Sequence, residues 1–305
     1  MTVTGRGPLA DGTELHLPEQ QRLRANDLDH AVLRWKGSGP NVLLCHGYLD
    51  MGFSWTSVAT RLQRCGYDTA AFDWRGHGTT EWVGAGGYYH FPDYVLDLHE
   101  LTQKLFGGEE YHLVGHSMGG SIACMFASTL PIGLRTLTTI EGLGPPDENA
   151  DHPVDRLKTW IRTVEGLRKS DQRAAIKDVD EAVRRMRVRN PTLPDKLGRF
   201  LAEQGTKLNS SGSREWTFDP LHRSRAPIPF RKDMFLQCLD RIAVPTLVVG
   251  SSNGFRLSDE QERIDHIEDT TVVEIQDVGH MVHWFAAEEL ASAIDKHIRR
   301  SAKAT

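Results

Sequence analysis

The segment Gly115-His116-Ser117-Met118-Gly119 constrains the fold more than any other part of the chain. It follows a strand-like apolar run at 111–114 and precedes a helix-like run at 121–127. A serine between a strand and a helix, flanked by glycines, is typical of a nucleophile elbow. The glycines let the strand and helix approach each other, and the sharp turn holds the serine in a strained backbone conformation. We therefore predict that Ser117 is a nucleophile.

The composition is that of a globular protein with one large core. Of the 305 residues, 39% are hydrophobic and 25% are charged, both ordinary values. The net charge of -5 argues against a nucleic-acid partner, although residues 147–236 carry 19 Lys and Arg against 14 Asp and Glu. A basic segment can attract an acidic substrate, dock on the acidic remainder, or present solvated helix faces. For this segment we favour the last interpretation, in which the charges lie on solvent-exposed helix faces.

Targeting signals and metal motifs are absent from the sequence. The first residues lack the apolar core of a signal peptide, and no stretch approaches the roughly 18 apolar residues of a membrane span. We expect a cytoplasmic protein without a membrane partner. Four cysteines, Cys45, Cys65, Cys124 and Cys238, are widely spaced without a zinc pattern, so we predict free and mostly buried thiols. No metal or organic cofactor is expected.

Short apolar runs alternate with helical patterns, which indicates βα units in a mainly parallel sheet. The predicted strands cover residues 42–45, 68–73, 111–114, 134–140, 246–249 and 271–275. The predicted helices outside the middle of the chain cover 54–64, 93–106, 258–267 and 285–299. These patterns predict an α/β fold.

The strand pattern stops after Gly144-Pro145-Pro146 and resumes only at residue 246. Apolar residues between them recur at helical spacing. We predict a helical cap over 145–236, inserted into a core formed by 1–144 and 237–305. Because α/β sheets bind ligands outside the carboxyl ends of their strands, we expect the cap to cover the active site.

A serine hydroxyl needs a base to become a good nucleophile. His280 is the best-placed histidine, because it follows the last predicted strand in Asp277-Val278-Gly279-His280 and lies downstream of the elbow. The glycine allows a sharp return toward the carboxyl edge of the sheet. We predict His280 as the general base. His283 is a weaker candidate.

Two backbone N–H groups are needed to hold the oxyanion of a tetrahedral intermediate. The predicted donors are Met118, directly after the nucleophile, and Tyr48, after the first predicted strand. Two further residues at strand ends, His46 and Trp74, are predicted to contact the substrate.

Four motifs together resemble the α/β-hydrolase superfamily over essentially the whole chain. They are His46-Gly47, the Asp-Trp-Arg-Gly-His-Gly run at 73–78, the elbow at 115–120, and Val278-Gly279-His280. Residues 89–94, 140–145 and 218–220 are similar to the serine-hydrolase-like branch. The resemblance implies an α/β-hydrolase fold, with a mostly parallel central sheet, flanking helices and a helical cap insertion.

The sequence departs from the superfamily at the third catalytic position. The resemblance places the acid after the strand at 246–249, where this chain has Asn253. In a serine protease, asparagine in place of the triad aspartate lowers turnover about 10⁴-fold. Some members of the superfamily carry the acid after the preceding strand, where this chain has Glu141. We favour Glu141 as the acid, and Asp259 is a distant third choice.

The resemblance implies a serine hydrolase acting on a small-molecule substrate. A carboxylic ester is the expected substrate, with amides and thioesters open. Because position 117 is serine, the activities of epoxide hydrolases and dehalogenases, which use a carboxylate nucleophile, are disfavoured. A carbon-carbon bond hydrolase, a cofactor-free oxygenase and a non-catalytic ligand-binding protein remain alternatives. The sequence leaves the oligomeric state open.

Overall fold

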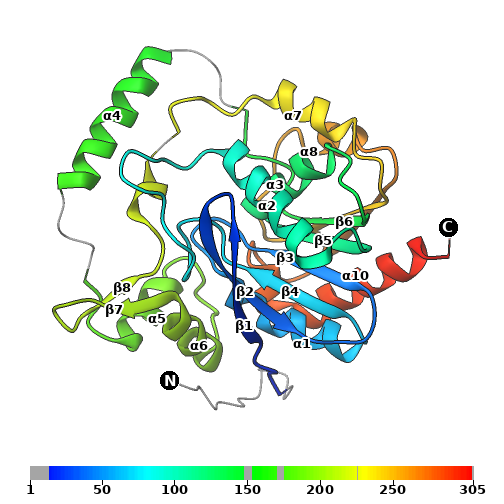
Figure 1. The fold of residues 1–305 in the computed structure, drawn as a ribbon, viewed down its shortest axis with the longest axis horizontal. Coiled ribbons are helices and arrows are strands. Elements are labelled where there is room, and N and C mark those ends of the chain that lie inside the picture. Colours follow the sequence, from blue (N-terminus) through cyan, green and yellow to red (C-terminus); the bar gives the residue numbers. More distant parts are fainter. Residues whose placement is uncertain (1–13, 148–152, 170–174, 225, 304–305) are drawn as a thin grey trace.

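The structure is a computed structural model that describes residues 14–147, 153–169, 175–224 and 226–303. Residues 1–13, on which the prediction of no signal peptide rests, lie outside this part. An eight-stranded sheet forms the centre, in the order β1-β2-β4-β3-β5-β6-β9-β10, and helices cover both of its faces (Figure 1). This arrangement confirms the predicted α/β fold.

The sheet is antiparallel at one edge and parallel elsewhere. Its strands are β1 (Glu19–Ala25), β2 (Leu28–Trp35), β3 (Asn41–Cys45), β4 (Asp68–Phe72), β5 (Tyr111–His116), β6 (Leu134–Ile140), β9 (Thr246–Ser251) and β10 (Thr270–Ile275). β2 pairs antiparallel with β1 and with β4, and the other neighbours pair in parallel. The predicted strands are present and differ from the observed ones only at their ends. The sequence analysis did not predict β1 and β2.

Helices pack against the two faces of the sheet through separate apolar clusters. The helices on one face are α2 (Phe91–Phe106), α3 (Met118–Ala127) and α7 (Lys232–Leu239). Those on the other face are α1 (Thr56–Arg64), α9 (Val282–Phe285) and α10 (Ala287–Ser301). α8 (Glu260–Asp265) connects β9 to β10, and the short 3-10 helix η1 (Gly52–Trp55) precedes α1. The strands between these layers are buried on both sides, which explains their continuous apolar sequences.

The segment predicted as a helical cap contains helices and a small sheet. Its elements are α4 (Pro153–Lys169), α5 (Val179–Arg187), α6 (Asp195–Gly205), β7 (Thr206–Leu208), β8 (Arg214–Trp216) and the 3-10 helix η2 (Pro220–Arg223). β7 and β8 pair antiparallel, and no strand was predicted there. The boundary predicted at residue 236 falls within α7, which packs on the core. Residues 148–152, 170–174 and 225 of the predicted cap lie outside the described residues.

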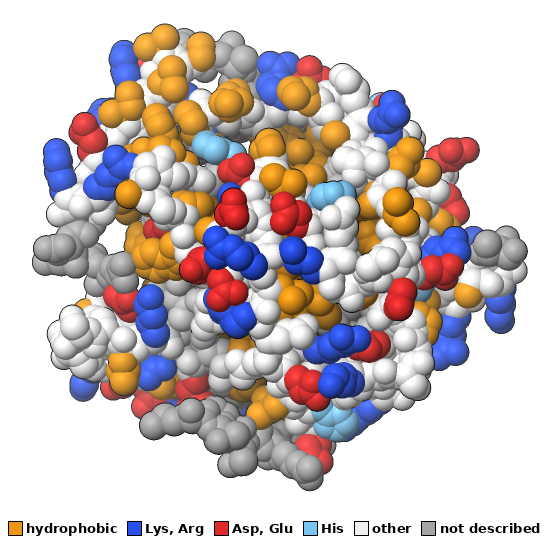
Figure 2. Space-filling view, viewed as in Figure 1, with side chains coloured by type: hydrophobic (Ala, Val, Ile, Leu, Met, Phe, Trp, Pro, Cys, Tyr) orange, Lys and Arg blue, Asp and Glu red, His pale blue; other side chains and the backbone are white. Residues whose placement is uncertain are grey.

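α4 lies at the periphery of the molecule (Figure 1). Within Pro153–Lys169 only Val164 is buried, and three of its apolar side chains are exposed, namely Val154, Leu157 and Ile161. Figure 2 shows hydrophobic side chains gathered in the same region, at the upper left. Elsewhere on this face, positive and negative side chains are interspersed.

The cysteines and the surface qualify two sequence predictions. All four cysteines are free, and Cys45 and Cys124 are buried. Cys65 is exposed, which corrects the prediction of buried thiols for that residue: it directly follows the last residue of α1, at a turn. Within the described residues, no helix is both long enough and apolar enough to cross a bilayer.

Candidate active site

Ser117 occupies the sharp turn between β5 and α3. Its backbone has φ 52° and ψ -118°, in a region that residues with a Cβ rarely adopt. Close packing of three backbone segments holds this turn. A Cβ added to Gly115 would lie 2.4 Å from the carbonyl oxygen of Gly119, and one added to Gly119 would lie 2.5 Å from that of Cys45. The flanking glycines therefore allow β3, β5 and α3 to meet beneath the serine.

His280 lies between the serine hydroxyl and a carboxylate. Its Nε2 is 3.0 Å from Ser117 Oγ, and its Nδ1 is 2.6 Å from Glu141 Oε2. With the hydrogen on Nδ1, the ring donates to Glu141 and accepts from Ser117. The His280 side chain is 37% exposed and that of Glu141 only 1%. The arrangement brings together the three residues predicted as nucleophile, base and acid.

Glu141 is held by a set of hydrogen bonds at the end of β6. Its backbone has φ 45°, a left-handed conformation that is uncommon for glutamate. The carboxylate accepts from the Ser251 N–H at 3.1 Å, from the Ser251 hydroxyl and from the Phe255 N–H at 2.9 Å. Burial opposes its ionisation, but the hydrogen bonds from His280, Ser251 and Phe255 outweigh burial and hold the pKa of Glu141 below its usual range. The carboxylate is therefore negatively charged at neutral pH.

The loop after β9 leaves room for this carboxylate. A Cβ added to Gly254 would lie 1.7 Å from Glu141 Oε1 and 2.1 Å from the Ser251 hydroxyl. Any side chain at Gly254 would therefore displace the carboxylate or its hydroxyl partner. Gly254 was not singled out in the sequence, because the signal is a missing side chain and its meaning depends on Glu141.

The other two positions considered for the acid do not contact His280. The Asn253 side chain is exposed and makes no hydrogen bond with any described residue, while its backbone N–H donates to the Val278 carbonyl at 3.1 Å. Asp259 forms an ion pair with Arg263 at 2.9 Å. The structure thus offers His280 an acid from the end of β6 and none from the loop after β9.

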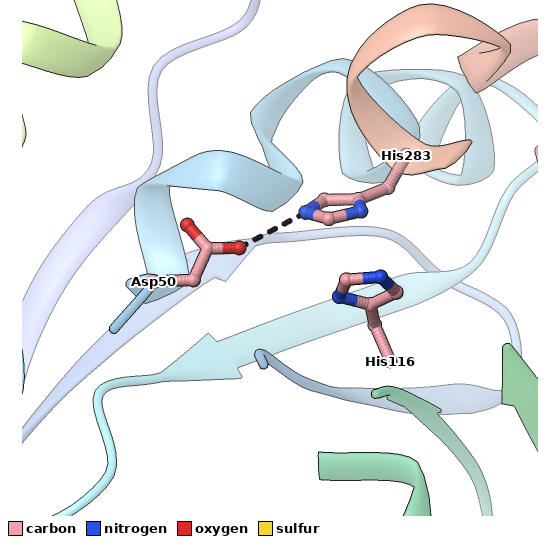
Figure 3. Close-up of side chains that lie close together, drawn as sticks. All are labelled: Asp50, His116 and His283. Carbon is pink, nitrogen blue, oxygen red and sulfur yellow. Dashed lines mark hydrogen bonds and ion pairs between the residues drawn. The ribbon is translucent and has the colours of Figure 1, made fainter. Parts of the chain in front are cut away.

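The side chains of Asp50, His116 and His283 lie close together near the loop that carries His280, and Figure 3 shows how the three face one another. His283 Nε2 is 3.1 Å from Asp50 Oδ2, and the rings of His116 and His283 are 4.5 Å apart. His116 Nε2 lies 2.8 Å from the His280 carbonyl. Burial lowers the pKa of His283 to about 3 and raises that of Asp50 to about 7. His283, the weaker candidate for the base, is thus turned toward Asp50 and serves the loop that carries His280.

The same three residues are the group within the described residues that could hold a metal ion. Their donor atoms all lie within 4.8 Å of one another, and imidazole and carboxylate are ligands that suit zinc. The Nδ1 atoms of His116 and His283 have no hydrogen-bond partner. Their Nε2 atoms bind the His280 carbonyl and Asp50, so the cluster supports the loop that carries His280.

His46 and Trp74 are not pocket residues, which corrects the prediction of substrate contact. Both side chains are fully buried, and neither lines the cavity at Ser117. His46 Nε2 accepts from the Trp74 N–H at 3.0 Å, and the Trp74 indole donates to the His46 carbonyl at 2.9 Å. Burial holds the pKa of His46 well below its usual range, so the ring is neutral. The two residues lock the ends of β3 and β4 together.

Ser117 opens into a cavity of about 1080 Å³. Tyr48 and Met118, the predicted oxyanion donors, both line it. Met118 is the first residue of α3, where a backbone N–H has no partner within the helix. Apolar lining comes from Phe91, Phe255, Phe285, Pro145 and Pro146.

We call the segment predicted as a cap, residues 145–236, the insert. One of its loops completes the cavity wall with Arg189, Asn190, Pro191 and Thr192. The insert therefore contributes directly to the site. None of these residues was identified from the sequence: attraction of an acidic substrate by the basic segment was one alternative, but solvated helix faces were favoured.

The sequence of residues 40–287 matches the family described as alpha/beta hydrolase fold. A serine hydrolase-like protein from Danio rerio is 26% identical over 176 residues, which cover 57% of this chain and 53% of that protein. The match thus spans about half the length of this relative.

Two further comparisons cover most of the chain. The 2-succinyl-6-hydroxy-2,4-cyclohexadiene-1-carboxylate synthase of Yersinia pseudotuberculosis is 30% identical over 240 residues, covering 73% of this chain and 84% of that protein. Among solved structures, a thioesterase domain from the curacin biosynthetic pathway superposes with a TM-score of 0.82 at 27% identity, covering 92% of this chain and all of that domain. With the elbow, the parallel sheet and the family match in agreement, the chain belongs to the α/β-hydrolase superfamily.

Proposed function

We propose that the protein is a serine hydrolase that cleaves a small carboxylic ester or thioester through an acyl-enzyme on Ser117. One observation carries the proposal: His280 contacts Ser117 Oγ at 3.0 Å and Glu141 at 2.6 Å through its two ring nitrogens. This is the arrangement in which an imidazole takes the serine proton while a carboxylate stabilises the imidazolium that forms.

The reaction has two halves that use the same residues. In the first, His280 takes the Ser117 proton, the serine oxygen attacks the substrate carbonyl, and His280 gives the proton to the departing alcohol or thiol. In the second, His280 takes a proton from water, and the resulting hydroxide attacks the acyl-enzyme carbonyl. His280 then returns the proton to Ser117, and the acid product leaves.

The backbone N–H groups of Met118 and Tyr48 are assigned to the oxyanion of each tetrahedral intermediate. Their place on the cavity wall beside Ser117 supports this role. Preorganised donors of this kind each contribute about 10²-fold to 10³-fold in turnover. Because the donors to the oxyanion are backbone groups, this role is insensitive to residue type.

A second candidate reaction uses the same residues for proton abstraction. The relative that is 30% identical is named as a synthase of a cyclic carboxylate, and an activated serine can act as a base toward carbon as well as a nucleophile. The two reactions differ in whether an acyl group becomes attached to Ser117, which mass spectrometry detects.

The proposal is tested by hydrolysis of para-nitrophenyl butyrate and of a butyryl thioester by the wild type and Ser117→Ala. We expect wild-type turnover that falls at least about 10³-fold in the variant. Ser128→Ala is the matched control: its hydroxyl bonds only within α3, to the Met125 carbonyl, and its activity should match the wild type. Equal rates for Ser117→Ala and wild type would contradict the proposal.

A further inference from the structure

The cavity has two ends of different charge, and the strand order separates them. Tyr48 follows β3, on one side of β5 and its Ser117. The acidic residues on the cavity wall, Glu141 and Asp277, follow β6 and β10 on the other side. Both carboxylates of the described lining therefore lie on the same side of the nucleophile. The Tyr48 side has none.

A cation of the insert faces the cavity without a carboxylate partner. Arg189 lines the cavity, its side chain is exposed, and it makes no ion pair or side-chain hydrogen bond with any described residue. Its neighbours in the chain differ: Arg185 pairs with Glu181, and Arg187 pairs with Asp195 at 3.0 Å. Arg189 is thus the arginine of this stretch that lines the cavity, and its hydrogen-bond donors remain available.

The loop that carries Arg189 is anchored at both of its ends. The Arg189 backbone N–H donates to the Met186 carbonyl at 3.3 Å. At the far end, the Leu193 carbonyl accepts from Arg187 Nη2 at 2.9 Å. The Leu193 side chain is buried in a cluster with Met51, which belongs to the core. The loop therefore has a defined position against the core, and Arg189 is presented from a fixed backbone.

A second arginine of the insert lies at Tyr48. The Tyr48 hydroxyl donates to the His222 carbonyl at 2.7 Å, which places the next residue, Arg223, beside it. The Arg223 guanidinium lies 5.2 Å from the centre of the Phe218 ring and forms no ion pair with a described residue. Burial raises the pKa of Tyr48, and the positive charges of Arg223 and Arg189 both oppose that rise. Of the two arginines, Arg189 lines the cavity itself, whereas Arg223 belongs to the chain segment that Tyr48 contacts.

We infer that the substrate of this site carries an ionised carboxylate besides the bond that is cleaved, and that Arg189 binds this carboxylate at the Tyr48 end of the cavity, with Arg223 adding positive charge beside Tyr48. The inference rests on the proposed function, since it names the substrate class of the same site. Arginine suits this role because its planar fork can donate two parallel hydrogen bonds to one carboxylate. Asp277 and Glu141 would repel the same group, so the charges also orient the substrate across Ser117.

The test compares two pairs of esters, in each of which one member carries an ionised carboxylate and the other does not. In the first pair the carboxylate is on the acyl side: mono-para-nitrophenyl glutarate is compared with para-nitrophenyl pentanoate. In the second pair it is on the leaving-group side: the butyrate ester of para-hydroxybenzoate is compared with the butyrate ester of methyl para-hydroxybenzoate. We expect wild type to show a kcat/KM about fivefold to tenfold higher for the charged member of one pair, as for a partly exposed arginine–carboxylate pair.

Variants then assign the preference to the two arginines. Arg189→Gln and Arg223→Gln should each reduce the ratio of the two kcat/KM values, the double variant should abolish it, and Arg189→Lys should retain part of it. Arg184→Gln is the matched control, because it removes one positive charge from an exposed position on α5 that does not line the cavity. Its ratio should equal that of the wild type.

The outcomes separate this inference from the proposed function. Hydrolysis of the esters without a charge preference, or a preference that persists in the double variant, overturns the inference and leaves the serine hydrolase intact. If no ester is hydrolysed, the proposed function fails, and binding of the same pairs to Ser117→Ala decides the inference. Tighter binding of the charged member that disappears with both arginines supports the inference, and equal binding overturns it.

Discussion

The two halves of the active site are built in different ways. Ser117 and Glu141, at the ends of β5 and β6, have backbones in uncommon left-handed conformations, and the Glu141 carboxylate is held by backbone N–H groups of Ser251 and Phe255. The insert contributes Arg189 from an exposed position, and its α4 buries only Val164. Strained turns persist only where the surroundings fix them. The comparison teaches that the core holds Ser117, His280 and Glu141 in fixed positions, whereas the insert presents the side chains to which we assign substrate selection.

The largest expected effect concerns the acid in the core. Glu141→Gln removes the charge that stabilises the His280 imidazolium, so kcat for para-nitrophenyl butyrate should fall about 10³-fold to 10⁴-fold. Asn253→Ala is the control at the alternative position and should leave kcat within about twofold of wild type, since Asn253 makes no contact with His280. The melting temperature, measured by circular dichroism, should be nearly unchanged in both. A large loss of kcat in Asn253→Ala instead would break the assignment of Glu141.

A smaller loss of activity is expected from Gly254→Ala. The added Cβ would overlap Glu141 Oε1, at 1.7 Å in the present backbone, so the carboxylate must move away from His280. We expect kcat to fall about 10-fold to 100-fold, because a displaced acid orients the imidazole poorly. Gly84→Ala, in the loop between β4 and α2 where nothing lies within 4 Å of an added Cβ, tests the cost of an added methyl group without the clash. Wild-type kcat in Gly254→Ala would show that Glu141 does not need its observed position.

The stability of the protein at low pH is a further test of the difference between core and insert, because buried neutral histidines are concentrated in the core. Burial lowers the folded-state pKa of His112 on β5 to about 4, from an ordinary value of 6.5. Below pH 6.5 the unfolded chain therefore binds the proton that the folded chain excludes, and stability is lost as the pH falls. Between pH 7 and pH 5, His112→Asn should lose about 2 kcal/mol less unfolding free energy than wild type.

Urea unfolding at the two pH values measures this difference. Asp50 contributes with the opposite sign, because its folded-state pKa is raised to about 7 and its contribution declines as the pH rises toward that value. Identical losses for wild type and His112→Asn would mean that His112 is not held neutral by the fold.

The smallest effect is expected in the insert. Ile161 on α4 is 48% exposed, so Ile161→Ser should change the free energy of unfolding by no more than about 0.5 kcal/mol. Ile122→Ser on α3 is the comparison in the core, where the side chain is fully buried, and it should cost several kcal/mol, about 3 or more. Urea unfolding measures both changes. Equal losses of unfolding free energy in the two variants would contradict the difference between core and insert.

The sequence predicted those features whose signal is local. The elbow needs only the glycines around Ser117 and the periodicity on either side, and the central strands are continuous apolar runs. β1 was not predicted because its sequence has no apolar pattern. It is an edge strand, and its residues are mostly exposed and polar. Its pairing with β2 is visible only in the folded chain.

Features that depend on distant residues could not be predicted in the same way. His46 and Trp74 follow strands that end near the site, as Ser117 does, but their side chains are buried, and each hydrogen-bonds to the backbone of the other residue. Which way a side chain turns after a strand depends on packing partners elsewhere in the sequence. The availability of Arg189 likewise depends on where carboxylates from other segments lie.

The central claim is that Ser117 is an activated nucleophile. The most direct measurement is reaction of the purified chain with a fluorophosphonate, followed by intact mass and by peptide mapping. We predict a single adduct on Ser117 in the wild type and none in Ser117→Ala. Folded wild type that does not react, or an adduct that persists in Ser117→Ala, would contradict the claim.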